Sequence, residues 1–67
     1  MAVATVSKIT ASSSKSFDDA VKAGLQRASK TLRGITGLHV IDQKASVKDG
    51  KIAEFRVTME VTFILED

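Results

Sequence analysis

The feature that most constrains the fold is a strict alternation of apolar and polar residues after Asp49-Gly50. Every odd position from 53 to 65 is apolar, and the even positions from 54 to 62 are polar. This two-residue period is typical of a β-strand with one face on a hydrophobic core and the other on a wetter surface. The sequence therefore predicts a strand from about Lys51 to Leu65, which is much longer than an average strand.

A hairpin is predicted before this strand, because Asp-Gly favours two-residue turns. The turn sets the register of the two strands that it joins. The expected cross-strand pairs are Val40 with Met59, Leu38 with Val61, His39 with Glu60, and Gln43 with Arg56. This register places Val40 and Leu38 on the core face. The opposite face is expected to carry Gly37, His39, Ile41, Gln43, Arg56 and Glu60.

A helix is predicted from Ser16 to about Arg33. Ser16 is followed by Asp18 and Asp19, and this pattern indicates a capped helix start whose acidic side chains meet the positive end of the helix dipole. Apolar residues then recur every three or four positions, with polar residues between them. Gly34 lies where a left-handed C-terminal cap would end the helix.

The N-terminal segment predicts a short strand from Val3 to Thr10 and a loop from Ala11 to Lys15. The element order is therefore strand, helix, strand, strand. A crossover helix makes the first two strands parallel, and the hairpin makes the third antiparallel to both. The predicted fold is α+β: a β-α-β-β protomer whose three-stranded antiparallel sheet, in order 1-3-2, packs on one helix.

Composition indicates how so small a fold is held together. The 67 residues allow a single domain, 1–67, and they contain no cysteine and one histidine. Disulfides, thiolate metal sites and zinc sites with two or more Cys or His ligands are thereby excluded. A chain of this size buries only about 60% of its unfolded surface, and the second sheet face would expose Ile41, Ile52 and Ile64. We therefore expect self-association.

Several functional classes find no support in the sequence. No apolar run approaches the roughly 20 residues of a membrane helix, and the N-terminus lacks a secretory signal, so a cytoplasmic protein with no membrane partner is expected. The net charge of +2 comes from scattered residues of both signs, which does not support binding to nucleic acid.

His39 opposite Glu60 has the form of an acid-base pair. No nucleophile accompanies it, so we expect a structural pair and no enzyme.

Four segments spread along nearly the whole chain form a recognisable set: Ala11-Ser12-Ser13, Thr31-Leu32-Arg33, Val40-Ile41-Asp42-Gln43 and the stretch from Phe55 to Asp67. Together they resemble the dodecin family, which usually has Gly-Thr-Ser at the position of Ala11-Ser12-Ser13. The resemblance implies a hollow particle of twelve identical subunits, a homododecamer. It also implies non-catalytic binding, storage or sequestration of a flavin between protomers.

The family residues that hold the flavin are changed in this chain. The resemblance places Gly37 at the position of a Trp that stacks on the flavin ring, and Arg56 at the position of a Gln that hydrogen-bonds the ring edge. Loss of the stacking contact alone would weaken binding by about tenfold to a hundredfold. We predict a modified pocket for riboflavin, FMN or a similar small molecule. The predicted ligand-binding residues are Gly37, His39, Asp42, Gln43 and Arg56.

Two alternatives stay open. Arg56 could instead form a structural ion pair across a subunit interface, since Glu54 and Glu60 flank it. The family also includes calcium dodecins, which this chain resembles in lacking the Trp and carrying Arg, so the alternative is a calcium-binding particle without flavin. Calcium needs about six to eight oxygen ligands, which here only symmetry copies could bring together. The candidate carboxylates are Asp42, Asp49, Glu54, Glu60, Glu66 and Asp67.

Overall fold

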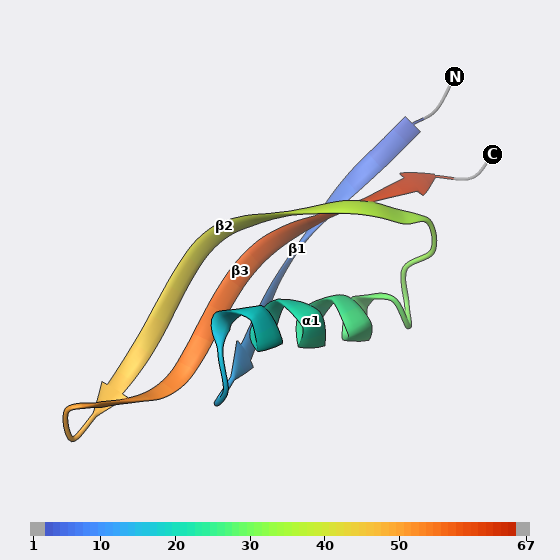
Figure 1. Cartoon of the computed structure of the whole chain (residues 1–67). Coiled ribbons are helices and arrows are strands. Elements are labelled where there is room, and N and C mark those ends of the chain that lie inside the picture. Colours follow the sequence, from blue (N-terminus) through green and yellow to red (C-terminus); the bar gives the residue numbers. More distant parts are fainter. Residues whose placement is uncertain (1–2, 66–67) are drawn as a thin grey trace.

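A computed structural model describes residues 3–65 and shows three strands and one helix in this range. They are β1 (Val3–Ser13), α1 (Phe17–Ala28), β2 (Ile35–Lys48) and β3 (Lys51–Leu65). The strands form one antiparallel sheet in the order β1-β3-β2, and α1 lies across one of its faces (Figure 1). The predicted α+β fold, β-α-β-β order and 1-3-2 sheet are confirmed.

The core lies between α1 and the central strand β3. Val57, Met59 and Val61 alternate along β3 and are fully buried. Partly buried side chains of the other elements pack against the centre of this core: Ile9, Ala11, Phe17, Val21 and Val40. The alternation in β3 therefore determines which sheet face the helix covers.

Small residues let α1 approach the sheet closely. Ala20, Gly24 and Ala28 are the buried residues of the helix. A Cβ added at Gly24 would overlap the Cε of Met59 and lie 3.0 Å from the Cβ of Ala11. The helix therefore sits so close to β1 and β3 that a larger side chain at position 24 would have to displace the end of the Met59 side chain.

The helix begins as predicted but ends earlier than predicted, at Ala28 instead of near Arg33. After Ala28 the chain forms a short turn, in which the backbone N–H of Leu32 donates to the carbonyl oxygen of Ala28 at 2.8 Å. Gly34 has a positive φ of 71°, and its carbonyl oxygen accepts a hydrogen bond from the N–H of Ile64 at 3.0 Å. Gly34 therefore turns the chain into β2 and does not cap the helix.

The first strand is longer than predicted. β1 continues through Ala11, Ser12 and Ser13, which were expected in a loop, because these residues still pair with β3. Ser13 also anchors the strand to the helix start, since its hydroxyl donates to the Asp19 carboxylate at 2.6 Å. The polar Ser residues therefore belong to the sheet edge, and the loop before α1 is short.

The β2–β3 hairpin follows the predicted register only in part. Leu38, His39 and Val40 face Val61, Glu60 and Met59 as predicted. An irregularity between Val40 and Asp42 leaves Ile41 without a partner, as an extra residue in a β-bulge does. Beyond it the pairs are Asp42 with Thr58, Gln43 with Val57, and Lys44 with Arg56. The predicted pair of Gln43 with Arg56 is therefore wrong.

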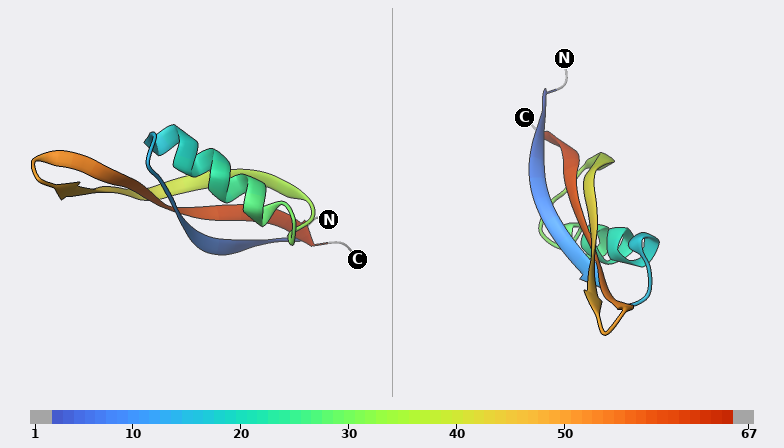
Figure 2. Two further views of the ribbon diagram at one scale, coloured as in Figure 1. Left: turned by 90° about the horizontal axis from the view of Figure 1, so that it is seen from below. Right: turned by 90° about the vertical axis from the view of Figure 1, so that its left-hand side faces the viewer.

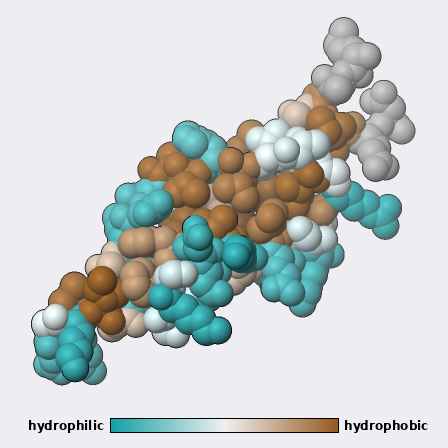
Figure 3. Space-filling model, in the orientation of Figure 1, coloured by the Kyte–Doolittle hydropathy of each residue, from teal (hydrophilic) through white to brown (hydrophobic). Residues whose placement is uncertain are grey.

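The chain is elongated, with principal extents of 52 × 19 × 13 Å, and the end of the hairpin projects beyond α1 (Figure 2). Its accessible surface is 4988 Å², against about 4,100 Å² expected for a compact protein of this mass. Large exposed apolar residues are Val3, Val6, Leu38, Ile41, Val47, Ile52 and Leu65. Figure 3 shows apolar surface along the molecule and near the hairpin end.

These exposed residues agree in part with the expected bare face. Ile41 and Ile52 are exposed as predicted, whereas Ile64 is partly buried beside Gly34. Leu38 shares the side of Val61 by register but lies more than a third exposed. Within residues 3–65, no helix has the length and apolar character needed to cross a membrane.

Candidate functional site

The sheet face turned away from α1, which we call the far face, is polar over most of its length. By register it contains Lys8, Thr10 and Ser12 of β1, Gly37, His39, Asp42 and Lys44 of β2, and Arg56, Thr58, Glu60 and Thr62 of β3. These residues alternate with the core residues along the same strands. The far face is therefore a direct product of the two-residue period that builds the core.

Most of the predicted ligand-binding residues share this face. Gly37, His39, Asp42 and Arg56 lie on it, whereas Gln43 faces Val57 and so lies on the side of α1. The expectation for Gln43 on the far face is wrong because the irregularity after Val40 shifts the alternation of β2 by one residue. The ligand-binding role of these residues stays a prediction.

Gly37 marks an open part of the far face. A Cβ added to this residue would have no atom within 4 Å, and the backbone at Gly37 does not require glycine. Gly37 lies opposite Thr62 of β3. A ligand placed here would meet backbone and a hydroxyl-bearing residue, and the far-face residues that the structure describes include no aromatic ring to stack on.

The middle of the far face holds two weak polar pairs. His39 Nδ1 lies 3.7 Å from Glu60 Oε1, and the His39 side chain is 74% exposed. The hydroxyls of Thr10 and Thr58 lie 3.2 Å apart. Exposed ion pairs contribute little to stability, so the His39–Glu60 pair is a cross-strand surface contact of the expected kind.

The part of the far face near the hairpin end holds two cations that pair along their own strands. Arg56 Nη2 donates to Glu54 Oε1 at 2.8 Å. Lys44 Nζ lies 3.5 Å from Asp42 Oδ2. The ion pair of Arg56 within this chain is therefore with Glu54 and not with Glu60.

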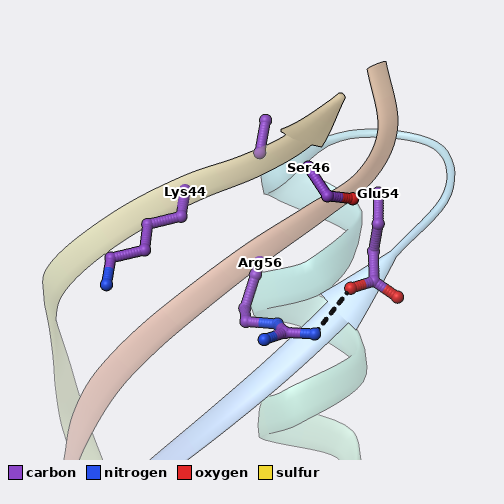
Figure 4. A pocket seen from close by; sticks show the side chains of 5 residues that line it. Lys44, Ser46, Glu54 and Arg56 are labelled. Carbon is purple, nitrogen blue, oxygen red and sulfur yellow. Dashed lines mark hydrogen bonds and ion pairs between the residues drawn. The ribbon is translucent and has the colours of Figure 1, made fainter. Parts of the chain in front are cut away.

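A shallow hollow of about 220 Å³ lies at this end of the sheet. Its lining residues are Lys44, Ala45, Ser46, Glu54 and Arg56. Figure 4 shows Glu54 and Arg56 directed toward each other, while Lys44 extends away from them. The sequence did not point to Lys44 or Ser46, because an unbroken register places them on the other face.

Carboxylates do not gather into a metal centre in the part of the chain that is described. Residues 3–65 contain no group of three or more His, Asp or Glu side chains placed to hold one ion. The candidates Asp42, Asp49, Glu54 and Glu60 are dispersed over the hairpin, and Glu66 and Asp67 lie outside the described residues. A calcium site would need ligands beyond those that residues 3–65 of one chain bring together.

Comparisons with known proteins establish the family. The family model for dodecin matches residues 3–66. The dodecin of Thermus thermophilus is 30% identical over 60 residues, which cover 90% of this chain and 87% of that protein. The chain belongs to the dodecin family. The family is known for non-enzymatic proteins that bind flavins.

Two solved structures show how far the likeness extends. The dodecin from Streptomyces davaonensis matches with a TM-score of 0.94 and 33% identity, over 98% of this dodecin and 97% of that chain. A calcium-chelating antigen from Mycobacterium tuberculosis, a calcium dodecin with a calcium-binding site, matches with a TM-score of 0.82 and 32% identity, over 96% and 91%. The fold is therefore shared with a calcium dodecin as well.

Proposed function

We propose that this dodecin forms a hollow homododecamer that binds and stores a flavin-type small molecule in pockets between subunits, without catalysis. The observation that carries the proposal is the far face, which places Gly37, His39, Asp42 and Arg56 on one uncovered polar surface. The resemblance to dodecins assigns two of these residues, Gly37 and Arg56, to the positions of the ring-stacking Trp and the ring-edge Gln. The far face is thus the wall on which a pocket between copies would be built.

The surface of a single chain supports the assembly. Within residues 3–65, seven large apolar side chains are exposed, and few residues are fully buried. Burial of such a patch against another copy would stabilise the fold by about 25 cal/mol per Å² of apolar surface. Assembly would therefore supply the stabilisation that disulfides give to other small domains, since this chain has no cysteine.

The open space at Gly37 supports a modified pocket. Without a ring at this position the flavin would lose a stacking partner, which is worth about 1 to 3 kcal/mol. Arg56 offers charge-assisted hydrogen bonds in place of a neutral amide. We therefore expect this dodecin to bind flavin about tenfold to a hundredfold more weakly than a member with the aromatic residue.

The proposal is tested with two measurements on the purified protein. Light scattering is expected to give twelve times 7.2 kDa, about 86 kDa. Titration of riboflavin or FMN with the protein is expected to quench flavin fluorescence at concentrations of tens of micromolar or above. A monomer or dimer at micromolar concentration would overturn the assembly, and unchanged fluorescence of both flavins up to millimolar protein would overturn the binding.

Calcium binding is the second candidate, favoured by the likeness to the calcium dodecin of Mycobacterium tuberculosis. The site would combine carboxylates of several copies around a symmetry axis. A calcium-binding particle is expected to melt at higher temperature with excess calcium than with a chelator, since a ligand that binds only the folded state stabilises it. Equal melting temperatures would eliminate this candidate.

A further inference from the structure

The apolar side of the β2–β3 hairpin continues past the helix that covers the core. Phe55 of β3 still contacts α1, because its ring centroid lies 5.0 Å from that of Phe17, the first residue of the helix, in an edge-to-face arrangement. Val47 and Ile52 lie nearer the turn than this contact and are 66% and 55% exposed. The core side of the sheet therefore ends in an uncovered apolar surface at the hairpin end.

A second irregularity of the hairpin brings the two largest side chains of this surface together. Ala45 pairs with Phe55, so it lies on the side of α1. Nearer the turn the register shifts by one residue, which leaves Ala53 without a partner in β2 and pairs Val47 with Ile52. Val47 follows Ala45 by two residues and therefore points to the same side of the sheet. We call Ala45, Val47 and Ile52 the hairpin strip.

The two strands that carry the hairpin strip have no third strand beside them. The last pair between β1 and β3 is Ser13 with Phe55, and beyond it the hairpin projects past α1 (Figure 2). A hairpin of two strands alone is at best marginally stable in water. The hairpin strip therefore needs a cover, which removes its apolar side chains from water and holds the two strands in place.

The 67 residues of one copy do not supply this cover. Val3 and Leu65 pair with each other at the opposite end of the sheet (Figure 1), and the molecule is 52 Å long. Residues 1–2 and residues 66–67 each span at most about 7 Å when fully extended. They are therefore too short to reach the hairpin strip, and the cover comes from another molecule.

The surface area indicates that the other molecule is a protein. The accessible surface of one copy exceeds the value expected for a compact protein of this mass by about 900 Å², and a stable interface buries about 800 Å² on each partner. Val3, Val6 and Leu65 expose apolar surface at the end opposite the hairpin. Each copy thus carries both the strip and a separate apolar surface, which is what head-to-tail association of copies requires.

We propose that a second copy of this chain covers the hairpin strip and buries Val47 and Ile52. The inference rests on the assembly in the proposed function and deepens it, because it assigns one subunit contact to named residues. It does not depend on flavin. Both tests below are therefore made without a ligand.

The first test places the same carboxylate at two neighbouring residues of β2. Val47→Asp puts it in the strip, and the control Lys48→Asp puts it opposite Lys51. Because burial of an unpaired charge opposes assembly, light scattering is expected to give Val47→Asp less than half of the parent's mass of about 86 kDa. Lys48→Asp is expected to keep the full mass. A full mass for Val47→Asp, or equal losses in the two variants, would overturn the inference.

A second test needs no disruptive substitution and decides the case if Val47→Asp does not fold. The chain has no cysteine, so Val47→Cys and the control Lys48→Cys each introduce a single thiol. In the purified protein, Val47→Cys is expected to react with N-ethylmaleimide at least about tenfold more slowly than Lys48→Cys. Since Val47 is 66% exposed within one copy, such protection reports a second copy. Equal rates would overturn the inference.

The two measurements separate this inference from the proposed function. If the parent forms a particle of about 86 kDa and Val47→Cys reacts as fast as Lys48→Cys, the assembly stands and the inference fails. The same result is expected if a different protein covers the strip, because the purified particle then leaves it open. If the parent has the mass of a single chain, both fail. Absence of flavin binding leaves the inference intact.

Discussion

The two faces of β3 differ in burial and in the contacts that their side chains make. Val57, Met59 and Val61 are fully buried under α1, whereas their neighbours Arg56 and Glu60 form surface contacts on the far face. One strand therefore supplies both the residues that hold the protomer together and the residues proposed to bind a ligand. Substitutions one position apart along β3 are therefore expected to change different properties: protein stability on the core face and ligand binding on the far face.

The largest expected effect is on the core face. Val61→Asp buries an unpaired charge at a fully buried position, which costs several kcal/mol and is comparable to the total stability of a small domain. We expect the variant to be unfolded by circular dichroism. Thr62→Asp is the matched control, because it adds the same charge one residue away on the far face and is expected to remain folded. Equal denaturant midpoints for the two variants would contradict the difference between the core face and the far face of β3.

A smaller effect is expected where α1 approaches the sheet. Gly24→Ala places a methyl group against the side chains of Met59 and Ala11, and overpacking of this kind costs about 1–3 kcal/mol. The gain of about 1 kcal/mol in helix propensity offsets part of this cost. We expect a net loss of stability in urea unfolding.

A double variant tests whether the contact with Met59 causes the stability loss expected for Gly24→Ala. In a Met59→Ala background, which removes the overlapping group, Gly24→Ala is expected to cost less or to be stabilising. If Gly24→Ala stabilises the parent protein as well, the close packing of α1 on β3 is not the constraint described above.

The smallest expected effect lies outside both faces, at the start of α1. Ser16 Oγ accepts a hydrogen bond from the N–H of Asp19 at 2.9 Å, and loss of such a cap costs about 1 kcal/mol. Ser16→Ala is therefore expected to lower the urea midpoint without changing flavin affinity. Ser14→Ala, a control at the exposed loop before the helix, is expected to have almost no effect. Equal losses in the two variants would argue against the cap.

Local patterns allowed most of the fold to be predicted. The alternation along β3, the Ser16 cap and the Asp49-Gly50 turn each act over a few residues, so the sequence displays them directly. The sheet order then follows from chain connectivity. These signals were sufficient for the fold and for the placement of Gly37, His39 and Arg56 on the far face.

The structure differs from the sequence-based prediction where tertiary contacts override local patterns. The irregularity after Val40 has no Gly to mark it, and it moves Gln43 to the side of α1 and brings Lys44 to the far face. Similarly, Gly34 resembles a helix cap in sequence, but its carbonyl oxygen binds the N–H of Ile64 in the distant β3. Neither effect is visible without the partner strand, which is why the hollow was not predicted.

The most direct test of the far face as a ligand-binding surface is a tryptophan substitution at Gly37, where a larger side chain meets no neighbouring atom. Riboflavin binding is measured by fluorescence quenching for the parent protein, Gly37→Trp and the control Leu38→Trp, which places the ring on the side of α1. Gly37→Trp is expected to tighten binding about tenfold or more, and Leu38→Trp to leave it unchanged. Equal affinities for the parent and Gly37→Trp would contradict the account.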